Sequence, residues 1–294
     1  GLLRIPMGQW FGGRPVSMTG LAGVAISSFG RGQGVGQGMM RQALQEMRSQ
    51  RTALSALYGS TTSFYRRCGY ERAGARFLAE VQLKHLEGHR GPLQIHRLTS
   101  ANQHQAEELQ AGHVRRHGAL QRSPYIWHRV RNPRGQVAEG FGFYREENLE
   151  GYCYWVKDLV SFRDNTLEAT DLVLTSCDAT TTFLGLLSGQ RMFFNSARWP
   201  SSPSSPLLLS LSEPWQYTLR LDEHWMLRIV SLAEALTQRG YPEHLHGELH
   251  LEVKDPWFEE NSGRWVLKLN AGKAALEAGG RGDLHIDIGA LASL

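Results

Sequence analysis

The sequence predicts an α+β fold, because strand-like and helix-like patterns both recur along the chain. Apolar and polar residues alternate cleanly over 75–86, which is typical of a half-buried strand. Apolar residues recur at helical spacing from Met40 to Met47, which predicts an amphipathic helix over 37–50. Hydrophobic residues make up 41% of the 294 residues, enough for sizeable cores, so a globally disordered chain is excluded.

The N-terminal part predicts strands on both sides of the helix 37–50. A Gly-Gly-Arg-Pro turn signal at 12–15 divides the segment 1–26 into two strands. The second strand ends in a run of small apolar residues up to Ile26, as in a strand buried on both faces. A glycine-rich loop over 27–36 leads into the helix, and a strand over 54–58 and a short helix over 64–68 follow it.

The remainder of the chain predicts further strands and helices. After a linker at 88–92, strands are expected at 93–98, 150–160, 167–174, 217–230, 246–253 and 265–269, and helices at 100–117 and 178–187. Ser231 and Glu234 form a capping-box pattern that opens another helix, which stops at Gly240. The Ser/Pro cluster at 200–206 is the strongest signal in the chain for a break in secondary structure, and it either ends a unit or forms a loop within one.

Composition excludes several classes of protein. Lys and Arg number 32 against 28 Asp and Glu, and this net charge of +4 suits an anionic ligand but is too weak to indicate nucleic acid. Cys68, Cys153 and Cys177 are scattered, which argues against disulfides and zinc clusters and favours a reducing compartment. The longest apolar runs fall far short of the about 20 residues that cross a bilayer. We therefore expect a cytoplasmic protein with neither a membrane nor a nucleic-acid partner.

Histidines near the C-terminus invite a metal site. His246, Glu248 and His250 share one face of the expected strand 246–253, and His244 lies just before it. Leu249, Leu251 and Val253 occupy the other face, so we expect the histidines on the solvated side of an ordinary amphipathic strand, with no metal bound.

The sequence contains one candidate binding site for an anion, the loop Arg31-Gly32-Gln33-Gly34-Val35-Gly36 between a strand and a helix. Glycines let backbone N–H groups converge on an anion, and the start of a helix adds unsatisfied amides and a positive dipole end. Arg31 can neutralise a second phosphate charge, so the pattern suits a pyrophosphate. The loop is neither a Walker A motif nor a dinucleotide fingerprint. A plain turn before a helix explains the loop alone equally well.

In context, this loop resembles motif A of the GNAT acyltransferases. The segment 60–71, Ser-Thr-Thr-Ser-Phe-Tyr-Arg-Arg-Cys-Gly-Tyr-Glu, is similar to the S/T-x-x-x-Y-x-R-x-G-Y segment of the Eis-like branch. The segment 225–230, the pair Ala235-Leu236 and the segment Arg239-Gly240-Tyr241-Pro242 resemble the start of that branch's C-terminal domain, which has a sterol-carrier-protein-like fold. Separated segments in the right order make the resemblance specific.

The resemblance implies tandem GNAT (acyl-CoA N-acyltransferase) folds followed by a sterol-carrier-protein-like α/β domain. We expect a catalytic GNAT domain over 1–90, a GNAT-like domain without cofactor over 91–212, and the sterol-carrier-like domain over 213–294. The family's catalytic domain starts with a strand and two helices, and its terminal carboxylate is the family's base. We expect both to lie outside this sequence, and Leu294 is assigned no role.

The family's site residues fall on matching positions of this chain. The resemblance places acetyl-CoA, the acyl donor, against the backbone of Val24, Ala25 and Ile26, where one N–H polarises the thioester carbonyl. It places the pyrophosphate on the amides of Arg31, Gly32, Gln33, Gly34, Val35, Gly36 and Gln37, with Ser60 near the cofactor. Tyr65 matches the tyrosine that protonates the departing CoA thiolate, which a phenol of pKa about 10 does only if held against the sulfur. A packed core tyrosine is the alternative for Tyr65.

The resulting hypothesis is direct transfer of an acetyl group from acetyl-CoA to a primary amine. The resemblance suggests a small-molecule acceptor with several amines, such as an aminoglycoside, and leaves polyamines and protein lysines open. It also implies a homo-oligomer. The alternative is a non-catalytic CoA- or lipid-binding module, whose third domain would place Leu249, Leu251, Trp265 and Leu267 around an apolar ligand or in a plain core.

Overall fold

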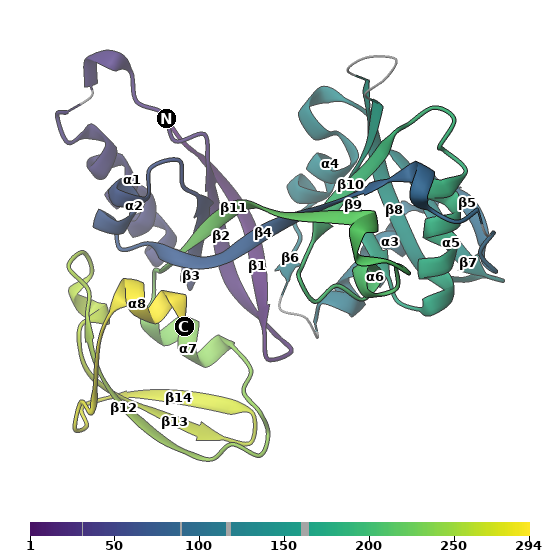
Figure 1. The fold of residues 1–294 in the computed structure, drawn as a ribbon. Coiled ribbons are helices and arrows are strands. Elements are labelled where there is room, and N and C mark those ends of the chain that lie inside the picture. The colour runs from purple at the N-terminus through teal and green to yellow at the C-terminus, as the bar shows by residue number, and fades with distance from the viewer. Residues whose placement is uncertain (31, 89, 116–118, 160–164) are drawn as a thin grey trace. The chain divides into compact units, whose positions relative to one another are not determined.

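The computed structural model describes residues 1–30, 32–88, 90–115, 119–159 and 165–294, which form two compact units (Figure 1). The first unit comprises 1–75, 114–123 and 224–294. The second comprises 76–113 and 124–223. Each unit combines β-sheet and α-helices, so the predicted α+β class is confirmed.

The first sheet of the first unit begins with a hairpin. Strands β1 (Leu3–Phe11) and β2 (Arg14–Ala22) pair antiparallel from Leu3–Ala22 to Phe11–Arg14, around a turn whose two glycines both have positive φ. The other strands of this sheet are β3 (Leu54–Tyr58), parallel to β2, the part of β11 (Tyr217–Ile229) from His224 on, antiparallel to β3, and β6 (Leu120–Gln121) beside β1.

Helices cover both faces of this sheet. On one face lie α1 (Val35–Ser49) and α2 (Thr62–Arg67), and the buried stripe of α1 is the one predicted from Met40 to Met47. On the other face lies α7 (Leu232–Gln238). Successive residues of β11 point to opposite faces, so Met226 packs with α1 and α2 while Leu227 packs with α7.

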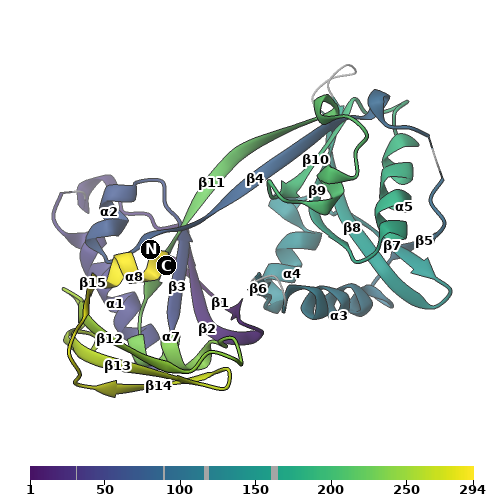
Figure 2. The same ribbon diagram turned by 60° about the horizontal axis from the view of Figure 1, so that its bottom comes forward.

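A second sheet completes the first unit. Its strands, in spatial order, are β14 (Lys273–Ala278), β13 (Gly263–Asn270), β12 (Gly247–Lys254) and β15 (Leu284–Asp287), which runs into α8 (Ile288–Ser293). Both α7 and α8 lie between the two sheets (Figures 1 and 2). One core therefore unites Val16 and Met18 of β2 with Leu251 and Val253 of β12.

The second unit is a sheet with helices on both faces. Its strands run in the order β5 (Gln94–Leu98), β7 (Glu139–Arg145), β8 (Asn148–Leu159), β9 (Asn165–Leu174), β10 (Ser196–Ser201) and the part of β4 (Glu71–Gln82) from Arg76 on. Its helices are α3 (Gln103–Val114), α4 (Pro124–Arg131), α5 (Cys177–Ser188) and α6 (Pro206–Leu209). Short 3-10 turns lie at Ser28–Gly30, Leu83–His85, Pro133–Gly135, Pro214–Gln216 and Glu259–Asn261.

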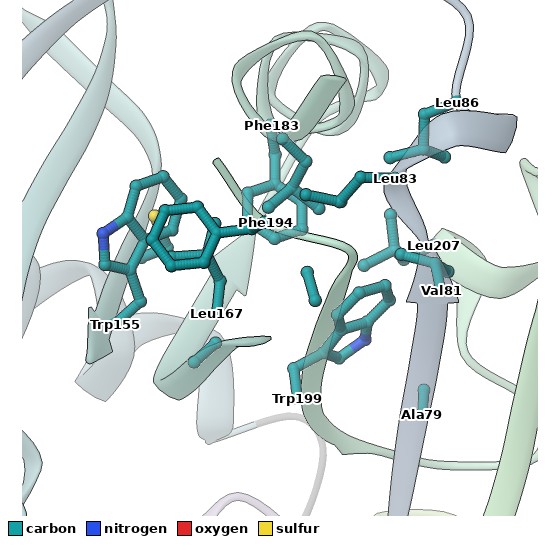
Figure 3. Close-up of a cluster of buried hydrophobic side chains, with 14 of the residues drawn as sticks. Ala79, Val81, Leu83, Leu86, Trp155, Leu167, Phe183, Phe194, Trp199 and Leu207 are labelled. Atoms are coloured by element: carbon teal, nitrogen blue, oxygen red, sulfur yellow. The ribbon is translucent and has the colours of Figure 1, made fainter. Parts of the chain in front are cut away.

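Strand β8 shows how the two cores of this unit are built. Tyr152 and Tyr154 face the cluster that contains Trp127 of α4, whereas Trp155 faces the cluster of α5. Figure 3 shows that second cluster, with Phe183 of α5 among the strand residues. The Ser/Pro cluster at 200–206 joins β10 to α6 inside this unit, so it is a loop and not a boundary.

Two sequence-based predictions are wrong in detail. The strand expected to reach Ile26 ends at Ala22, because Gly23 adopts φ +59° and turns the chain out of the sheet. His250 is buried, at 8% exposure, and accepts a 3.2 Å hydrogen bond from the Arg281 amide at Nδ1, whereas Leu249 is 44% exposed. The C-terminal turn around Arg281 covers the face of β12 that the alternation assigned to solvent.

Candidate functional site

The glycine-rich loop lies where two parallel strands separate. Pairing between β2 and β3 ends at Leu21 and Leu57, and α1 connects the two strands. A strand–helix–strand connection of this kind brings the start of its helix to the carboxyl ends of the strands, where ligands of open α/β sheets bind. The loop, the start of α1 and the segment after β3 therefore meet at one edge of the sheet.

Val24, Ala25 and Ile26 form the extended segment after β2. Ala25 is paired through both backbone groups, since its N–H donates to the Gly1 carbonyl (2.9 Å) and its carbonyl accepts from the Gly1 amine (2.7 Å). Within the described residues, no hydrogen bond involves the N–H groups of Val24 and Ile26. These two donors on either side of Ala25 are thus free to bind a ligand.

The loop itself has the backbone of an anion cradle. Gly32 and Gly34 adopt φ +77° and +76°, and a Cβ at either would meet nothing within 4 Å, so the space above them is open. Gly34 is the N-cap of α1 and no side chain caps the helix, whose first turn also lacks an acidic residue. The amides of Val35, Gly36 and Gln37 accordingly remain available, as expected at an uncapped helix start.

Two further loop residues were predicted to bind the pyrophosphate. The Gln33 side chain donates a 2.9 Å hydrogen bond to the Phe29 carbonyl, which fixes the curvature of the loop. Arg31 lies outside the described residues, so its predicted contact with the pyrophosphate stays a prediction.

Gly36 brings three of the predicted segments into contact. A Cβ at this position would lie 2.6 Å from Ile26 Cδ1 and 3.2 Å from the Phe64 ring. The absence of a side chain thus lets the first turn of α1 pack against the end of the β2 segment and against α2. Phe64 immediately precedes Tyr65, so the glycine-rich loop and the predicted acid lie close together.

Tyr65 is held in place by packing. It is 6% exposed, and its ring makes edge contacts with Phe64 and Tyr70 at centroid distances of 5.1 and 6.1 Å. Its hydroxyl makes no hydrogen bond to a described residue. Burial, together with nearby Cys68, raises the pKa of the phenol above its usual value, so it is protonated at neutral pH. Ser60 is exposed in the turn between β3 and α2, two residues before α2 begins.

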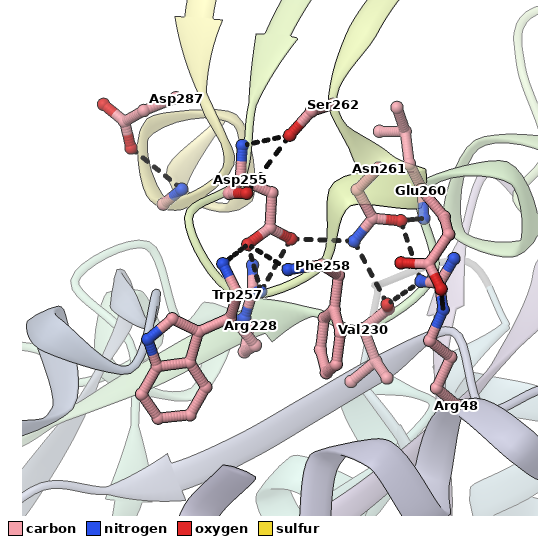
Figure 4. A network of polar contacts seen from close by, with 12 residues as sticks. Arg48, Arg228, Val230, Asp255, Trp257, Phe258, Glu260, Asn261, Ser262 and Asp287 are labelled. Atoms are coloured by element: carbon pink, nitrogen blue, oxygen red, sulfur yellow. Dashed lines mark hydrogen bonds and ion pairs between the residues drawn. The ribbon is translucent and has the colours of Figure 1, made fainter. Parts of the chain in front are cut away.

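A buried ion pair lies next to the turn that follows α2, and Figure 4 shows its two members, Arg228 and Asp255. Arg228 of β11 donates from Nη2 to both carboxylate oxygens of Asp255, each at 2.7 Å, and neither side chain is exposed. The guanidinium lies directly against Gly69, since a Cβ there would be 2.8 Å from its Nε. Sequence reasoning missed this pair, because nothing local to Arg228 marks a partner 27 residues away.

The second unit repeats the strand–helix–strand arrangement with different chemistry. Strands β9 and β10 are parallel and α5 connects them, as α1 connects β2 and β3. The start of α5 is capped by the Ser176 side chain, which accepts from the Ala179 amide (3.0 Å). Glu150 accepts from the Ser176 hydroxyl (2.5 Å), and Arg145 binds both Glu150 and Asp178. Carboxylates therefore surround the start of α5, which corresponds to the position in the first unit where α1 presents open amides.

Two further properties of the described residues bear on function. None of the helices in the described ranges has the length and apolar character to cross a membrane. Across those same ranges, no three or more His, Cys, Asp or Glu side chains are grouped so that they could hold a metal ion.

Comparison with protein families identifies the parts of the chain. Residues 4–73 and 118–229 each match an acetyltransferase (GNAT) domain, and residues 232–294 match a sterol carrier protein domain. Fold and site together thus define an N-acetyltransferase with tandem GNAT domains and a sterol-carrier-like C-terminal domain. No curated protein matches the chain.

Solved structures agree with this class. A GCN5-related N-acetyltransferase from Anabaena variabilis is 33% identical, with a TM-score of 0.92 over 100% of this chain and 76% of that one. One from Kribbella flavida is 26% identical, with a TM-score of 0.83 over 99% and 73%. Eis1 from Mycobacterium abscessus, at 19% identity, shares the fold with a TM-score of 0.75 over 100% and 76%. The chain belongs to the GCN5-related N-acetyltransferase family.

Proposed function

We propose that this N-acetyltransferase uses acetyl-CoA and transfers the acetyl group directly to a primary amine of a small molecule. The proposal rests on the open, uncapped start of α1, which follows two left-handed glycines and packs against the helix of Tyr65. An anion at that position would meet several backbone N–H groups and the positive end of a 15-residue helix.

The described residues fit the parts of acetyl-CoA in order. The amides from Gly32 to Gln37 suit the pyrophosphate, and the free N–H groups of Val24 and Ile26 suit the pantetheine amides and the thioester carbonyl. The role proposed for Ala25 is limited to its place in this segment, because both of its backbone groups are already paired. Ser60 lies exposed at the same edge of the sheet and suits a polar contact with the cofactor.

Acetyl-CoA supplies an acetyl group activated as a thioester. A backbone N–H of the 24–26 segment polarises the carbonyl, which makes its carbon a better target for a neutral amine. As the carbon–nitrogen bond forms and the carbon–sulfur bond breaks, the Tyr65 hydroxyl gives its proton to the sulfur, and the proton lost by the attacking nitrogen returns to the Tyr65 phenolate through solvent. The raised pKa keeps that proton in place over the whole physiological range.

The acceptor class follows from the family resemblance. We propose that the acceptor is a multi-amine molecule of the aminoglycoside kind. We also propose that the protein is a homo-oligomer, and that each chain divides into domains at residues 90 and 212. The lipid-binding alternative receives no support from Leu249, which was expected to face an apolar ligand and is 44% exposed.

Release of CoA thiol from acetyl-CoA, measured with a panel of amines, tests the proposal. The wild-type chain should release thiol only when an amine is present, and Tyr65→Phe should lower the rate by about tenfold to a thousandfold. Tyr125→Phe is the matched control, since Tyr125 is exposed on α4 and its variant should keep the wild-type rate. An unchanged rate in Tyr65→Phe would remove Tyr65 from the mechanism, and CoA binding without turnover would favour a non-catalytic module.

A further inference from the structure

An arginine on α1 has an unusual partner. Arg41 is exposed on α1, and its guanidinium carbon lies 5.0 Å from the centre of the Trp257 ring. Among the described residues, no carboxylate lies within ion-pair distance of Arg41. Its charge is therefore held against an aromatic face and not neutralised, which leaves the edge N–H groups of the guanidinium available to an anion.

The sterol-carrier-like domain holds the backbone of Trp257 in place. The Trp257 amide donates a 3.0 Å hydrogen bond to Asp255, whose carboxylate is anchored by buried Arg228 (Figure 4). The next residue, Phe258, packs beneath Arg48 of α1, with the guanidinium carbon 5.3 Å from the ring centre. The loop 255–258 thus lies along α1 and is fastened at both ends of the contact.

Arg41 lies close to the phosphate loop along the helix. It follows Gln37 by one turn, so the two residues share a face of α1. The rise from Val35 to Arg41 is about 9 Å, and helical side chains lean toward the N-terminus, so an arginine side chain at this position is long enough to extend toward the loop. An anion adjoining one bound on the loop would fall within that reach.

CoA has such an anion. Its pyrophosphate is attached to a ribose whose 3′ position bears a further phosphate, which carries nearly two negative charges at neutral pH. We propose that Arg41 binds the ribose 3′-phosphate of CoA and that Trp257 holds the guanidinium in position for it. This inference rests on the proposed use of acetyl-CoA, and it gives the sterol-carrier-like domain a part in selecting the cofactor.

Calorimetric titration with CoA and with 3′-dephospho-CoA tests the proposal on binding alone. Wild type should bind CoA more tightly than 3′-dephospho-CoA. Arg41→Ala should weaken CoA binding by about tenfold and leave 3′-dephospho-CoA binding unchanged. Arg14→Ala is the matched control, because Arg14 is exposed in the hairpin turn at the opposite end of β2 and its variant loses the same charge.

Substitutions of Trp257 test its positioning role. Trp257→Leu should lower the CoA preference severalfold, Trp257→Phe should restore most of it, and Trp257→Leu should have no further effect in the Arg41→Ala background. Equal weakening of both ligands by Arg41→Ala, or no weakening of either, would overturn the inference. Failure of wild type to bind either ligand would instead refute the proposed use of acetyl-CoA.

Discussion

Replacing Asp255 with asparagine should destabilise the first unit by about 3–5 kcal/mol, because Arg228 would remain as a buried charge without a counter-ion. Both hydrogen bonds that Arg228 donates go to this carboxylate, at 2.7 Å each. Its Nε and Nη1 are buried and have no hydrogen-bond partner among the described residues. Nothing in this part of the structure can replace the lost charge.

The reverse substitution should cost less. In Arg228→Met, the Asp255 carboxylate keeps the Trp257 amide (3.0 Å), the Phe258 amide (3.3 Å) and Asn261 Nδ2 (2.9 Å) as donors. Hydrogen bonds to a charged group contribute about 1.5–3 kcal/mol each, so they offset much of the burial cost. We expect a loss of about 2 kcal/mol, and a double variant less destabilised than the sum of the two single variants.

Urea unfolding followed by tryptophan fluorescence and by circular dichroism measures these differences, with a separate transition fitted for each unit. Asp255→Glu serves as a control that keeps the charge. The reasoning would be refuted if Asp255→Asn cost less than about 1 kcal/mol, or if Arg228→Met proved the more damaging of the two.

Three further predictions concern the helices and buried groups of the first unit. Gly36→Ala should weaken CoA binding measured by calorimetry, because its Cβ would lie 2.6 Å from a neighbouring side chain, whereas Gly38→Ala meets nothing and should bind normally. Burial raises the pKa of the Cys68 thiol from 9.0 to about 11. The neutral thiol therefore stabilises the fold below pH 9, and this contribution is lost as the pH rises through 11. The Tm of Cys68→Ala should fall less steeply than that of wild type over this pH range. Ser231→Ala should lower stability in urea by about 1 kcal/mol, since the side chain caps α7; an unchanged midpoint would contradict that role.

Features with a local cause were predictable from the sequence. The strand at 54–58 has the predicted bounds, because its apolar run is closed on both sides by polar and turn residues. The buried face of α1 follows from the spacing between Met40 and Met47. The open backbone of the glycine-rich loop was likewise implied by its glycines, two of which adopt left-handed φ.

Features with a distant cause were not predictable. The end of β2 depends on the conformation of Gly23, which composition alone does not reveal. His250 is buried by a turn some 31 residues later, and β6 pairs with β1 across more than a hundred residues. Alternation within one strand reports which residues share a face, but the segment that covers the face is chosen elsewhere in the chain.

The core shared by Val16, Met18, Leu251 and Val253 has a consequence for how this architecture can change. Removal of the sterol-carrier-like segment would expose the apolar face of the sheet that carries the glycine-rich loop, so we expect its loss or exchange to destabilise the first unit. Substitutions in either part must therefore be tolerated by the other. We expect recombination to preserve the two together, and diversity among relatives to accumulate away from their common interior.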